Sequence, residues 1–489
     1  MSMIQVRNLT FAYEGSYDTI FENVSFRFDT DWRLGLTGRN GRGKTTLLRL
    51  LMGKYEYQGE IAAPVRFDYF PFEVTDPSRA AQAVVEEIIP NYEPWRLSRE
   101  LSLLEMEEAA LMDRPFATLS MGERTKLLLA ALFLREGGFL LIDEPTNHLD
   151  MHARAITSRY LRGKQGFLLV SHDRVFLDSC IDHILAINKA GMEVQRGNFS
   201  SWQENKRQQD AFEREESERL KRDIGRLNEA SRRTAGWSDK IEKSKTGTHP
   251  ADRGYIGHQS AKMMQRAKST QRRREAAVEE KSKLLHNVES AEALALHPLA
   301  HHAPRLAELS DVRICYGEHI ACENIGFTIK TGERVALLGR NGCGKSSVLK
   351  LLLGEPISYT GALHMASGLR ISYVPQDTAL LRGSLKAYAR ESGVEESLFL
   401  AILRKLDFAR AQFEKEMQHY SAGQKKKVLL ARSLCEQAHL YIWDEPLNYI
   451  DVLSRVQIEE LVLKHRPTLL FVEHDRAFCD AIATKTVRM

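Results

Sequence analysis

The feature that most constrains this chain is an internal repeat. Three segments occur twice: GRNGRGKT at 38–45 and GRNGCGKS at 339–346, LLIDEPTNHLD at 140–150 and YIWDEPLNYID at 441–451, and SHDRVF at 171–176 and EHDRAF at 473–478. The offset between the copies is 301 residues for the first two pairs and 302 for the third. Because the motifs keep their spacing over so long a stretch, they indicate a duplicated domain rather than coincidental matches.

The repeat divides the chain into three parts. We expect a first domain over residues 1–200, a linker over 201–304 and a second domain over 305–489. A chain of 489 residues is long enough for several domains with large buried cores.

Within each copy, segments that favour strands alternate with segments that favour helices. Apolar runs at 167–170 and 468–472 predict buried strands, whereas 44–52 and 122–134 predict helices. This alternation predicts an α/β fold in each copy, built on a mainly parallel sheet.

The linker differs in composition from both copies. Residues 203–289 contain 21 lysines and arginines against 15 aspartates and glutamates, with few strand formers and two narrow apolar stripes. We expect a long α-helical hairpin, whose two antiparallel helices are joined by a loop over 236–257 where glycine, serine and threonine cluster. The chain outside this window is slightly acidic, so the basic charge is concentrated in the linker, and nucleic acid is the partner that such charge favours.

Two classes of protein are disfavoured by the overall composition. No apolar stretch approaches the length needed to cross a bilayer, and the first residues lack the layout of a signal peptide, so we expect a cytoplasmic protein without a membrane partner. The six cysteines are scattered and include no C-x-x-C pair, which argues against a disulfide framework and against a zinc site.

The pattern GxxxxGK[ST], present in both copies, is typical of a phosphate-binding loop. Its glycines let successive backbone N–H groups face phosphates at a helix N-terminus, and its lysine reaches the β- and γ-phosphates. A glycine-rich turn without a ligand is the alternative, which the second copy disfavours. The residues expected to bind ATP in the two loops are Gly38, Arg39, Asn40, Gly41, Arg42, Gly43, Lys44, Thr45, Thr46, Gly339, Arg340, Asn341, Gly342, Cys343, Gly344, Lys345, Ser346 and Ser347.

Each copy also ends an apolar run in the dipeptide Asp-Glu and carries a histidine further along. The first carboxylate suits a Mg²⁺ ion and the second suits the polarisation of an attacking water. The lysine-to-glutamate separation is 100 residues in both copies, which disfavours an incidental surface turn. We expect the histidines to contact the γ-phosphate. The expected catalytic residues are Glu144, Glu445, His172 and His474, and the expected Mg²⁺ ligands are Thr45, Asp143, Ser346 and Asp444.

A further element identifies the family that these motifs resemble. LSMGE at 119–123 and YSAGQ at 420–424 match the signature LSGGE or LSGGQ of the ATP-binding cassette superfamily, and the tandem layout resembles its ABC-F branch. The resemblance covers both copies fully and the linker in general character, and it implies two tandem P-loop NTPase cassettes. It adds as expected ATP-binding residues Ser120, Gly122, Glu123, Ser421, Gly423 and Gln424, with Tyr13 and Tyr316 stacking on adenine and Gln376 as a further Mg²⁺ ligand.

The resemblance also implies how the two halves cooperate. In this family the signature serine of one cassette caps the ATP held by the other, so that ATP joins the halves and hydrolysis releases them. We therefore expect an ATPase that works as a monomer by intramolecular closure. One departure is Phe72, which stands where the family has glutamine and cannot coordinate Mg²⁺. The neighbouring residue Glu73 could substitute for the glutamine, but nothing in the sequence shows that it does, so we expect slower hydrolysis at the first site.

Three functions remain open for such a motion: a ribosome-binding translation factor, the ATPase subunit of an exporter, and a DNA-associated ATPase. The linker discriminates among them. A helix of about 30 residues extends about 45 Å and can carry positive charge into an RNA groove. Exporter cassettes need no such arm, and DNA-binding cassettes usually carry far longer coiled coils, so the sequence favours the ribosome.

Within the ABC-F proteins, GRNGRGKTTLLRLL, YIWDEPLNYID and GYIG at 254–257 resemble the Lsa-like antibiotic-resistance proteins. That resemblance implies protection of the 70S ribosome against lincosamides, streptogramins A and pleuromutilins, with the linker close to 23S rRNA and to tRNA near the exit site. A housekeeping ABC-F translation factor is the alternative. The linker residues expected to contact the ribosome are Trp237, Tyr255, Ile256, Met263, Met264, Arg272, Arg273 and Arg274. The apolar members could instead close the hairpin, and the arginines could form a solvated helix face.

Overall fold

The computed structural model describes residues 2–14, 19–147, 149–188, 191–244, 294–408 and 410–489, with scattered positions between 262 and 276. The chain forms two compact units. One unit contains both repeats, and the other consists of residues 188–190 and 201–290. The boundaries expected from the sequence, at 200 and 305, remain predictions.

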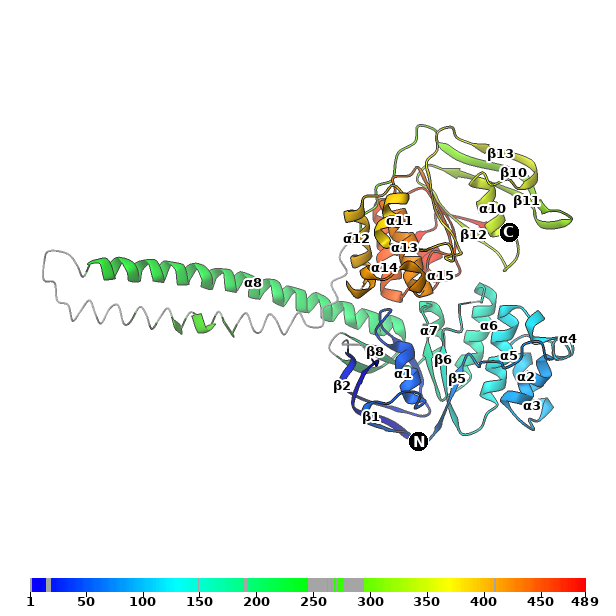
Figure 1. The fold of residues 1–489 in the computed structure, drawn as a ribbon, viewed down its shortest axis with the longest axis horizontal. Helices are drawn as coiled ribbons and strands as arrows, with labels where there is room; N and C mark the ends of the chain where they lie inside the picture. The colour runs from blue at the N-terminus through cyan, green and yellow to red at the C-terminus, as the bar shows by residue number, and fades with distance from the viewer. Residues whose placement is uncertain are drawn as a thin grey trace. The chain divides into compact units, whose positions relative to one another are not determined.

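The first repeat alternates strands and helices, as its sequence pattern predicted (Figure 1). Its elements are β1 (Met3–Ala12), β2 (Thr19–Asp29), β3 (Arg33–Thr37), α1 (Lys44–Leu51), β4 (Gln58–Ala62), β5 (Arg66–Phe70), α2 (Ala81–Ile88), α3 (Pro94–Leu103), α4 (Glu108–Leu111), α5 (Met121–Phe133), β6 (Gly138–Asp143), α6 (Met151–Arg162), β7 (Phe167–Val170), α7 (Arg174–Cys180), β8 (His183–Ile187) and β9 (Met192–Arg196).

The second repeat follows a similar order, but its described residues form two rather than three α-helices between the helix that follows the phosphate loop and the signature helix. Its elements are β10 (Arg305–Tyr316), β11 (His319–Lys330), β12 (Arg334–Leu338), α10 (Lys345–Leu352), β13 (Ser358–Met365), β14 (Ile371–Val374), α11 (Leu385–Glu391), α12 (Glu396–Lys405), α13 (Ala422–Cys435), β15 (Leu440–Asp444), α14 (Val452–His465), β16 (Leu469–Val472), α15 (Arg476–Ile482) and β17 (Lys485–Arg488).

A parallel sheet lies at the centre of each repeat and confirms the predicted α/β class. The first has strand order β5-β6-β7-β3-β8-β9, and the second has order β14-β15-β16-β12-β17. All neighbours are parallel except β8 and β9. The carboxyl ends of parallel strands share one edge of a sheet, so the loops after β3, β6 and β7 lie together. These loops carry the phosphate-binding, Asp-Glu and histidine motifs.

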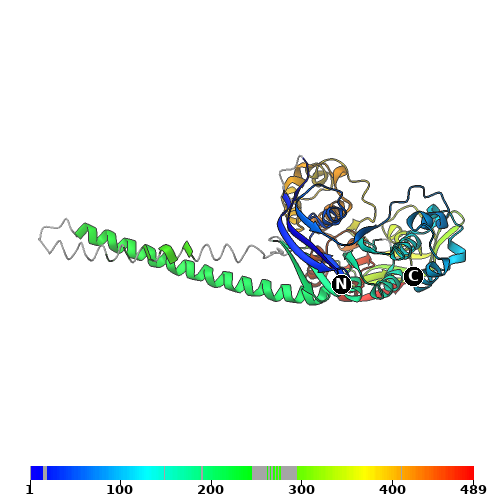
Figure 2. The same ribbon diagram turned by 90° about the horizontal axis from the view of Figure 1, so that it is seen from below.

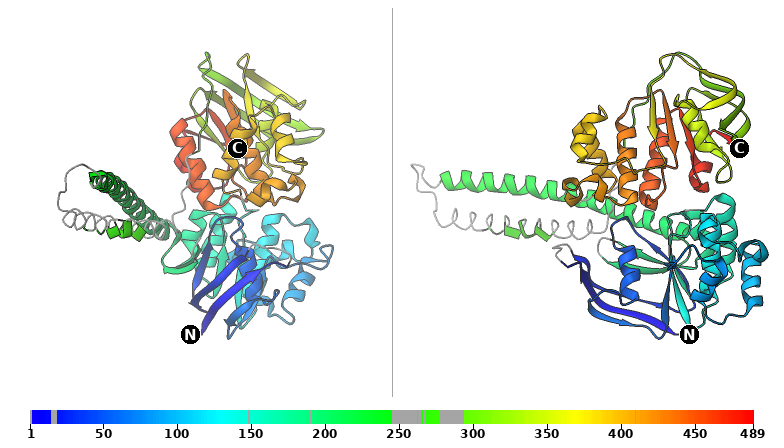
Figure 3. Two further views of the ribbon diagram at one scale, coloured as in Figure 1. Left: turned by 60° about the vertical axis from the view of Figure 1, so that its left-hand side comes forward. Right: turned by 45° about the vertical axis from the view of Figure 1, so that its right-hand side comes forward.

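Each repeat also has an antiparallel sheet that the sequence pattern did not predict. The strand orders are β2-β1-β4 and β11-β10-β13. In the second repeat, Leu306, Leu309 and Val312 of β10 pack with Val348 and Leu349 of α10 in one hydrophobic cluster. The antiparallel strands therefore cover the helix that follows the phosphate loop, and they lie apart from helices α11–α14 (Figure 3). The helices α2–α5 of the first repeat likewise gather away from β1 and β2 (Figure 1).

The linker helix is longer than expected. Helix α8 runs without a break over Phe199–Ser244, which is 46 residues and about 70 Å (Figures 1 and 2). The expected start of the loop at Gly236 is therefore wrong, because this position lies within the helix. A single glycine costs a helix only about 1 kcal/mol, and α8 continues from Gly236 to Ser244. Residues 237–244 of the expected loop also lie in α8, whereas residues 245–257 and most of the second helix lie outside the described residues.

Candidate nucleotide sites

Both phosphate loops turn into their helices through a glycine that no other residue could replace without strain. Gly43 precedes α1 with φ of 86°, and Gly344 precedes α10 with φ of 92°. A Cβ atom at Gly43 would lie 2.6 Å from Ile20, and one at Gly344 would lie 2.7 Å from the Ala321 carbonyl oxygen. This glycine conformation lets the loop turn sharply into the helix, so that the first backbone N–H groups of the helix face the loop. In each repeat these N–H groups form an anion cradle.

The loop lysines lie against the same loops. Lys44 Nζ donates to the carbonyl oxygen of Gly38 at 2.8 Å, and Lys345 Nζ donates to those of Gly339 and Arg340, both at 2.9 Å. Burial lowers the pKa of Lys44. Both lysines are thus held at the mouth of an anion cradle by carbonyl groups, which phosphate oxygens can replace as acceptors.

The residues expected to bind Mg²⁺ form a suitable set of hard oxygen donors. The Thr45 hydroxyl donates to Asp143 Oδ2 at 2.9 Å. Asp444 Oδ1 is buried and has no hydrogen-bond partner among the described residues, and burial raises the pKa of Asp444 to about 6. In the described ranges, there is no group of three or more histidine, cysteine, aspartate or glutamate side chains that could hold a metal ion. This pattern fits Mg²⁺, which is usually bound by one or two protein oxygens together with phosphates.

The two glutamates after these aspartates have an uncommon backbone conformation. Glu144 has φ of 50° and Glu445 has φ of 46°, a left-handed region that costs a non-glycine residue roughly 1–3 kcal/mol. His172 Nε2 lies 3.3 Å from Glu144 Oε1, and His474 Nε2 lies 3.5 Å from Glu445 Oε1. The structure therefore brings each predicted glutamate beside its predicted histidine.

The two glutamates differ in their electrostatic environments. Burial, with the neighbouring charge of Asp143, raises the pKa of Glu144 to about 8. Burial also acts on Glu445, but His474, Gln376 and Lys426 outweigh it and lower the pKa of Glu445. The protein's own side chains therefore favour the carboxylate form of Glu445 more than that of Glu144.

His474 is the largest cause that lowers the pKa of Glu445, and the ends of β5 and β14 add a further difference. Gln376 Nε2 donates to Glu445 Oε2 at 2.9 Å, and its expected role as a Mg²⁺ ligand remains a prediction. In the first repeat, the side chain of Phe72 has no polar group that could make such a bond, and that of Glu73 is exposed. The Tyr69 hydroxyl donates to Asp143 Oδ2 at 3.0 Å instead. Sequence reasoning had not singled out this tyrosine.

The signature segments begin helices α5 and α13 through capping boxes. The Ser120 hydroxyl accepts from the backbone N–H of Glu123, whose carboxylate accepts from the Ser120 N–H. Ser421 and Gln424 repeat this arrangement. The side chains of Glu123 and Gln424 are thus engaged in holding the helix N-terminus, and their contact with ATP remains a prediction.

The second signature approaches the first phosphate loop. A Cβ atom on Gly423 would lie 3.2 Å from Asn40 Nδ2 and 2.4 Å from the Tyr449 carbonyl oxygen. Asn40 Nδ2 donates to that same carbonyl at 2.8 Å. The signature glycine of one repeat therefore meets the phosphate loop of the other, and a larger residue at position 423 would separate them.

Two cavities lie over the phosphate loops. The larger, of about 590 Å³, is lined by Lys345, Ser346, Glu445 and His474, and also by Met121 and Asn147 of the first repeat. The smaller, of about 340 Å³, is lined by Lys44, Thr45, Asp143, Glu144 and His172. The two tyrosines expected to stack on adenine, Tyr13 and Tyr316, line the smaller and the larger cavity respectively.

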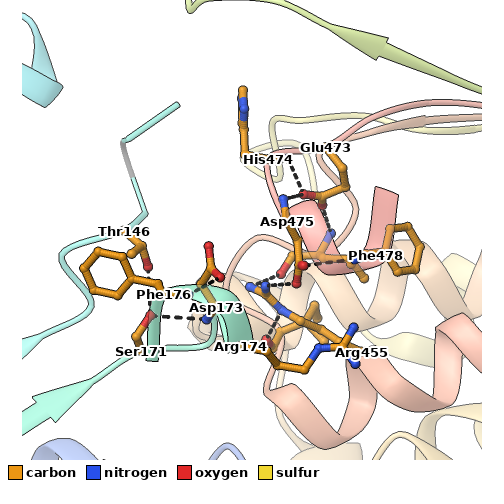
Figure 4. Close-up of polar contacts among 12 residues, drawn as sticks. Thr146, Ser171, Asp173, Arg174, Phe176, Arg455, Glu473, His474, Asp475 and Phe478 are labelled. Atoms are coloured by element: carbon orange, nitrogen blue, oxygen red, sulfur yellow. Dashed lines mark hydrogen bonds and ion pairs between the residues drawn. The ribbon is translucent and has the colours of Figure 1, made fainter. Parts of the chain in front are cut away.

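A buried charge cluster connects the histidine segments of the two repeats (Figure 4). Arg154 Nη1 donates to Asp173 Oδ2 at 2.9 Å and to the His474 carbonyl oxygen at 3.0 Å. Arg455 Nη1 pairs with Asp475 Oδ2 at 2.9 Å. Each aspartate also caps the helix after its histidine by accepting from Phe176 or Phe478. The segments that carry the two predicted catalytic histidines are thus joined through Arg154.

The predicted linker contacts are mostly beyond what the structure describes. Arg272 and Arg273 are exposed. Trp237 lies in α8, but its side chain is not described, and Tyr255, Ile256, Met263, Met264 and Arg274 lie outside the described residues.

Among the described residues, no helix has the length and apolar character needed to cross a bilayer.

Known proteins resemble this chain over nearly its whole length. The ribosome protection protein VmlR of Bacillus subtilis is 28% identical over 96% of this chain and 84% of its own length. The energy-dependent translational throttle protein EttA of Escherichia coli K12 is 26% identical over 95% of this chain and 88% of its own length.

The fold also has solved counterparts. The archaeal ribosome recycling factor aABCE1, solved in complex with the ribosomal stalk protein aP1, superimposes with a TM-score of 0.63 at 19% identity, over 98% of this chain and 87% of that chain. At this identity the likeness concerns the fold alone.

The family assignment rests on both repeats. Residues 21–147 and 322–448 each match the family model described as ABC transporter, and together they make up just over half of the chain. The chain therefore belongs to the ATP-binding cassette family, in its tandem ABC-F branch, and it is an ATP-hydrolysing protein.

Proposed function

We propose that this protein binds the ribosome and protects it from antibiotics that act at the peptidyl-transferase centre. The observation that carries the proposal is a pair of nucleotide sites lined or approached by residues of both repeats, in a chain similar to VmlR, a ribosome protection protein. ATP binding joins the two cassettes and hydrolysis separates them, so the nucleotide state sets whether the protein stays bound.

The site residues have distinct roles in this scheme. Lys44 and Lys345 bind the β- and γ-phosphates, and Ser421 and Ser120 approach the same nucleotides from the opposite cassette. Glu144 and Glu445 polarise the attacking waters, and His172 and His474 contact the γ-phosphate. Thr45 with Asp143, and Ser346 with Asp444, would hold Mg²⁺, which would supply positive charge beside the phosphates.

The linker is the part that reaches RNA. The described helix α8 is about 70 Å long, and the window 232–274 has twelve basic and three acidic residues. Basic residues interleaved with aromatic ones suit phosphates and unpaired bases. We infer that the linker lies near 23S rRNA and tRNA at the exit site, and that the protein acts as a cytoplasmic monomer.

Drug protection is tested by expressing the chain in a sensitive bacterial strain. The proposal predicts that the inhibitory concentrations of lincosamides, streptogramins A and pleuromutilins rise. The inhibitory concentration of an antibiotic that acts away from the peptidyl-transferase centre should not change. The matched control is the variant Glu144→Gln, Glu445→Gln, which should not protect because it cannot complete the cycle. Wild type and this variant giving equal susceptibility would contradict the proposal.

A second function is favoured by the similarity to EttA, a translational throttle protein. In that case the chain would act as a housekeeping translation factor. The same strain would then show no change in drug susceptibility, whereas purified protein would still bind 70S ribosomes and alter their rate of translation with ATP.

A further inference from the structure

A buried lysine in the second cassette has no role in the scheme above. Lys426, on the first turns of α13, is only 1% exposed, yet it lines the larger nucleotide cavity beside Glu445 and Gln376. A lysine is almost never fully buried unless its charge is paired or its donors are satisfied. Its position therefore indicates a specific task.

The ammonium group of Lys426 connects two segments that both contribute to the site. Its Nζ donates to the carbonyl oxygen of Pro375 at 2.8 Å, to that of Gln376 at 3.3 Å and to that of Asp444 at 3.1 Å. An ammonium group has three N–H donors. All three are directed at carbonyl groups, so none remains for a phosphate oxygen.

These bonds fix the backbone at the two residues that orient Glu445. Pro375 and Gln376 follow β14, and Asp444 ends β15. With the two ends tied through one nitrogen, the Gln376 side chain reaches Glu445 Oε2 at 2.9 Å. Movement of either end by an ångström would break that hydrogen bond. A displacement of this size can lower the rate of the catalysed reaction roughly a hundredfold.

The first cassette lacks both parts of this arrangement. Thr125 occupies the position on α5 that corresponds to Lys426, and Phe72 occupies the position that corresponds to Gln376. The side chain of Thr125 is too short to reach the backbone that follows β5. The side chain of Phe72 cannot form a hydrogen bond with Glu144. The lysine and the glutamine are thus present together in one site and absent together from the other.

We propose that Lys426 is a positioning residue that holds Gln376 against Glu445 and thereby makes the second ATP site the faster hydrolytic site. The proposal concerns ATP hydrolysis alone and does not depend on a role at the ribosome.

The first experiment measures turnover in a Glu144→Gln background, where only the second site hydrolyses ATP. Lys426→Met should lower kcat roughly tenfold to a hundredfold without changing the Kd for ATP. In a Gln376→Ala background the same substitution should add little, because the hydrogen bond that it supports is already gone. Lys425→Met, the neighbouring lysine on the same helix, is the control and should leave kcat unchanged.

Two outcomes would overturn the proposal. A weakened Kd for ATP with unchanged kcat would make Lys426 a phosphate ligand, and additive effects of Lys426→Met and Gln376→Ala would remove the link between them. Hydrogen exchange at residues 372–377 gives a readout apart from activity. It should accelerate in Lys426→Met and stay unchanged in Lys425→Met.

A reciprocal variant tests the idea with the second cassette intact. In a Glu445→Gln background, where only the first site works, Phe72→Gln together with Thr125→Lys should turn over faster than Phe72→Gln alone. If the lysine adds nothing there, Lys426 is only a packing residue.

Discussion

At the scale of single residues, the two predicted catalytic glutamates are equivalent in sequence but not in surroundings. Glu144 is buried beside Asp143, which raises its pKa to about 8, whereas His474, Gln376 and Lys426 lower the pKa of Glu445. Repeated motifs predicted both glutamates and both histidines. They could not predict Tyr69 or Lys426, because each acts through a contact with a distant segment rather than through a motif.

The asymmetry gives a prediction for single substitutions. Glu445→Gln should lower ATP turnover more than Glu144→Gln, because the second site has the oriented carboxylate and carries most of the hydrolysis. Steady-state phosphate release from the two purified variants measures this. Equal reductions from the two substitutions would show that Phe72 and the environment of Glu144 do not slow the first site.

At the scale of elements, helices α13 and α14 depend on a buried ion pair. Lys427 Nζ lies 2.9 Å from Asp451 Oδ2, with both side chains almost fully buried. Asp451 also caps α14 by accepting from the backbone N–H of Ser454 at 2.9 Å. Burial opposes ionisation, but Lys427 outweighs it and lowers the pKa of Asp451.

We predict that Lys427→Met destabilises the protein by about 3–5 kcal/mol at neutral pH, because it leaves a buried carboxylate unpaired. The destabilisation should shrink as the pH falls toward about 4, where the unpaired carboxylate becomes protonated. Thermal unfolding followed at both pH values measures this, with Lys425→Met as control. A destabilisation that is independent of pH would indicate poorer packing rather than an unpaired charge.

The linker helix shows where sequence reasoning about elements reached its limit. The composition predicted a helix, but glycine at 236 suggested its end too early, because one glycine costs a helix only about 1 kcal/mol and does not by itself end it. The antiparallel sheets were missed because strands such as β1 and β10 contain register shifts that interrupt a simple alternation.

The linker also supports a prediction about salt. If its arginines bind rRNA phosphates, neutralising Arg272, Arg273 and Arg274 should reduce the salt dependence of ribosome affinity by about one unit of slope for each arginine–phosphate pair that is removed. Binding measured across a salt series tests this, with Arg7→Gln on β1 as a control for the removal of an exposed charge. An unchanged slope would support a solvated helix face.

At the scale of the whole chain, the duplication explains why two sites exist, and residues of the two repeats contact each other. Asn40 meets the second signature, and Arg154 bonds the His474 carbonyl oxygen. The resemblance to the ABC-F branch implied such composite sites. The ion pair between Arg174 and Glu459 was not predictable from the repeat. Glu459 lies on α14, and the corresponding position on α6 of the first repeat is Ser158, so the ion pair has no counterpart there.

The central claim is that ATP joins the two cassettes into a ribosome-binding state that hydrolysis ends. The most direct test is co-sedimentation of the variant Glu144→Gln, Glu445→Gln with 70S ribosomes, with and without ATP. The variant should bind ATP, lose hydrolysis and sediment with ribosomes more fully than wild type when ATP is present. Undiminished hydrolysis, or ribosome binding that is the same with and without ATP, would contradict the claim.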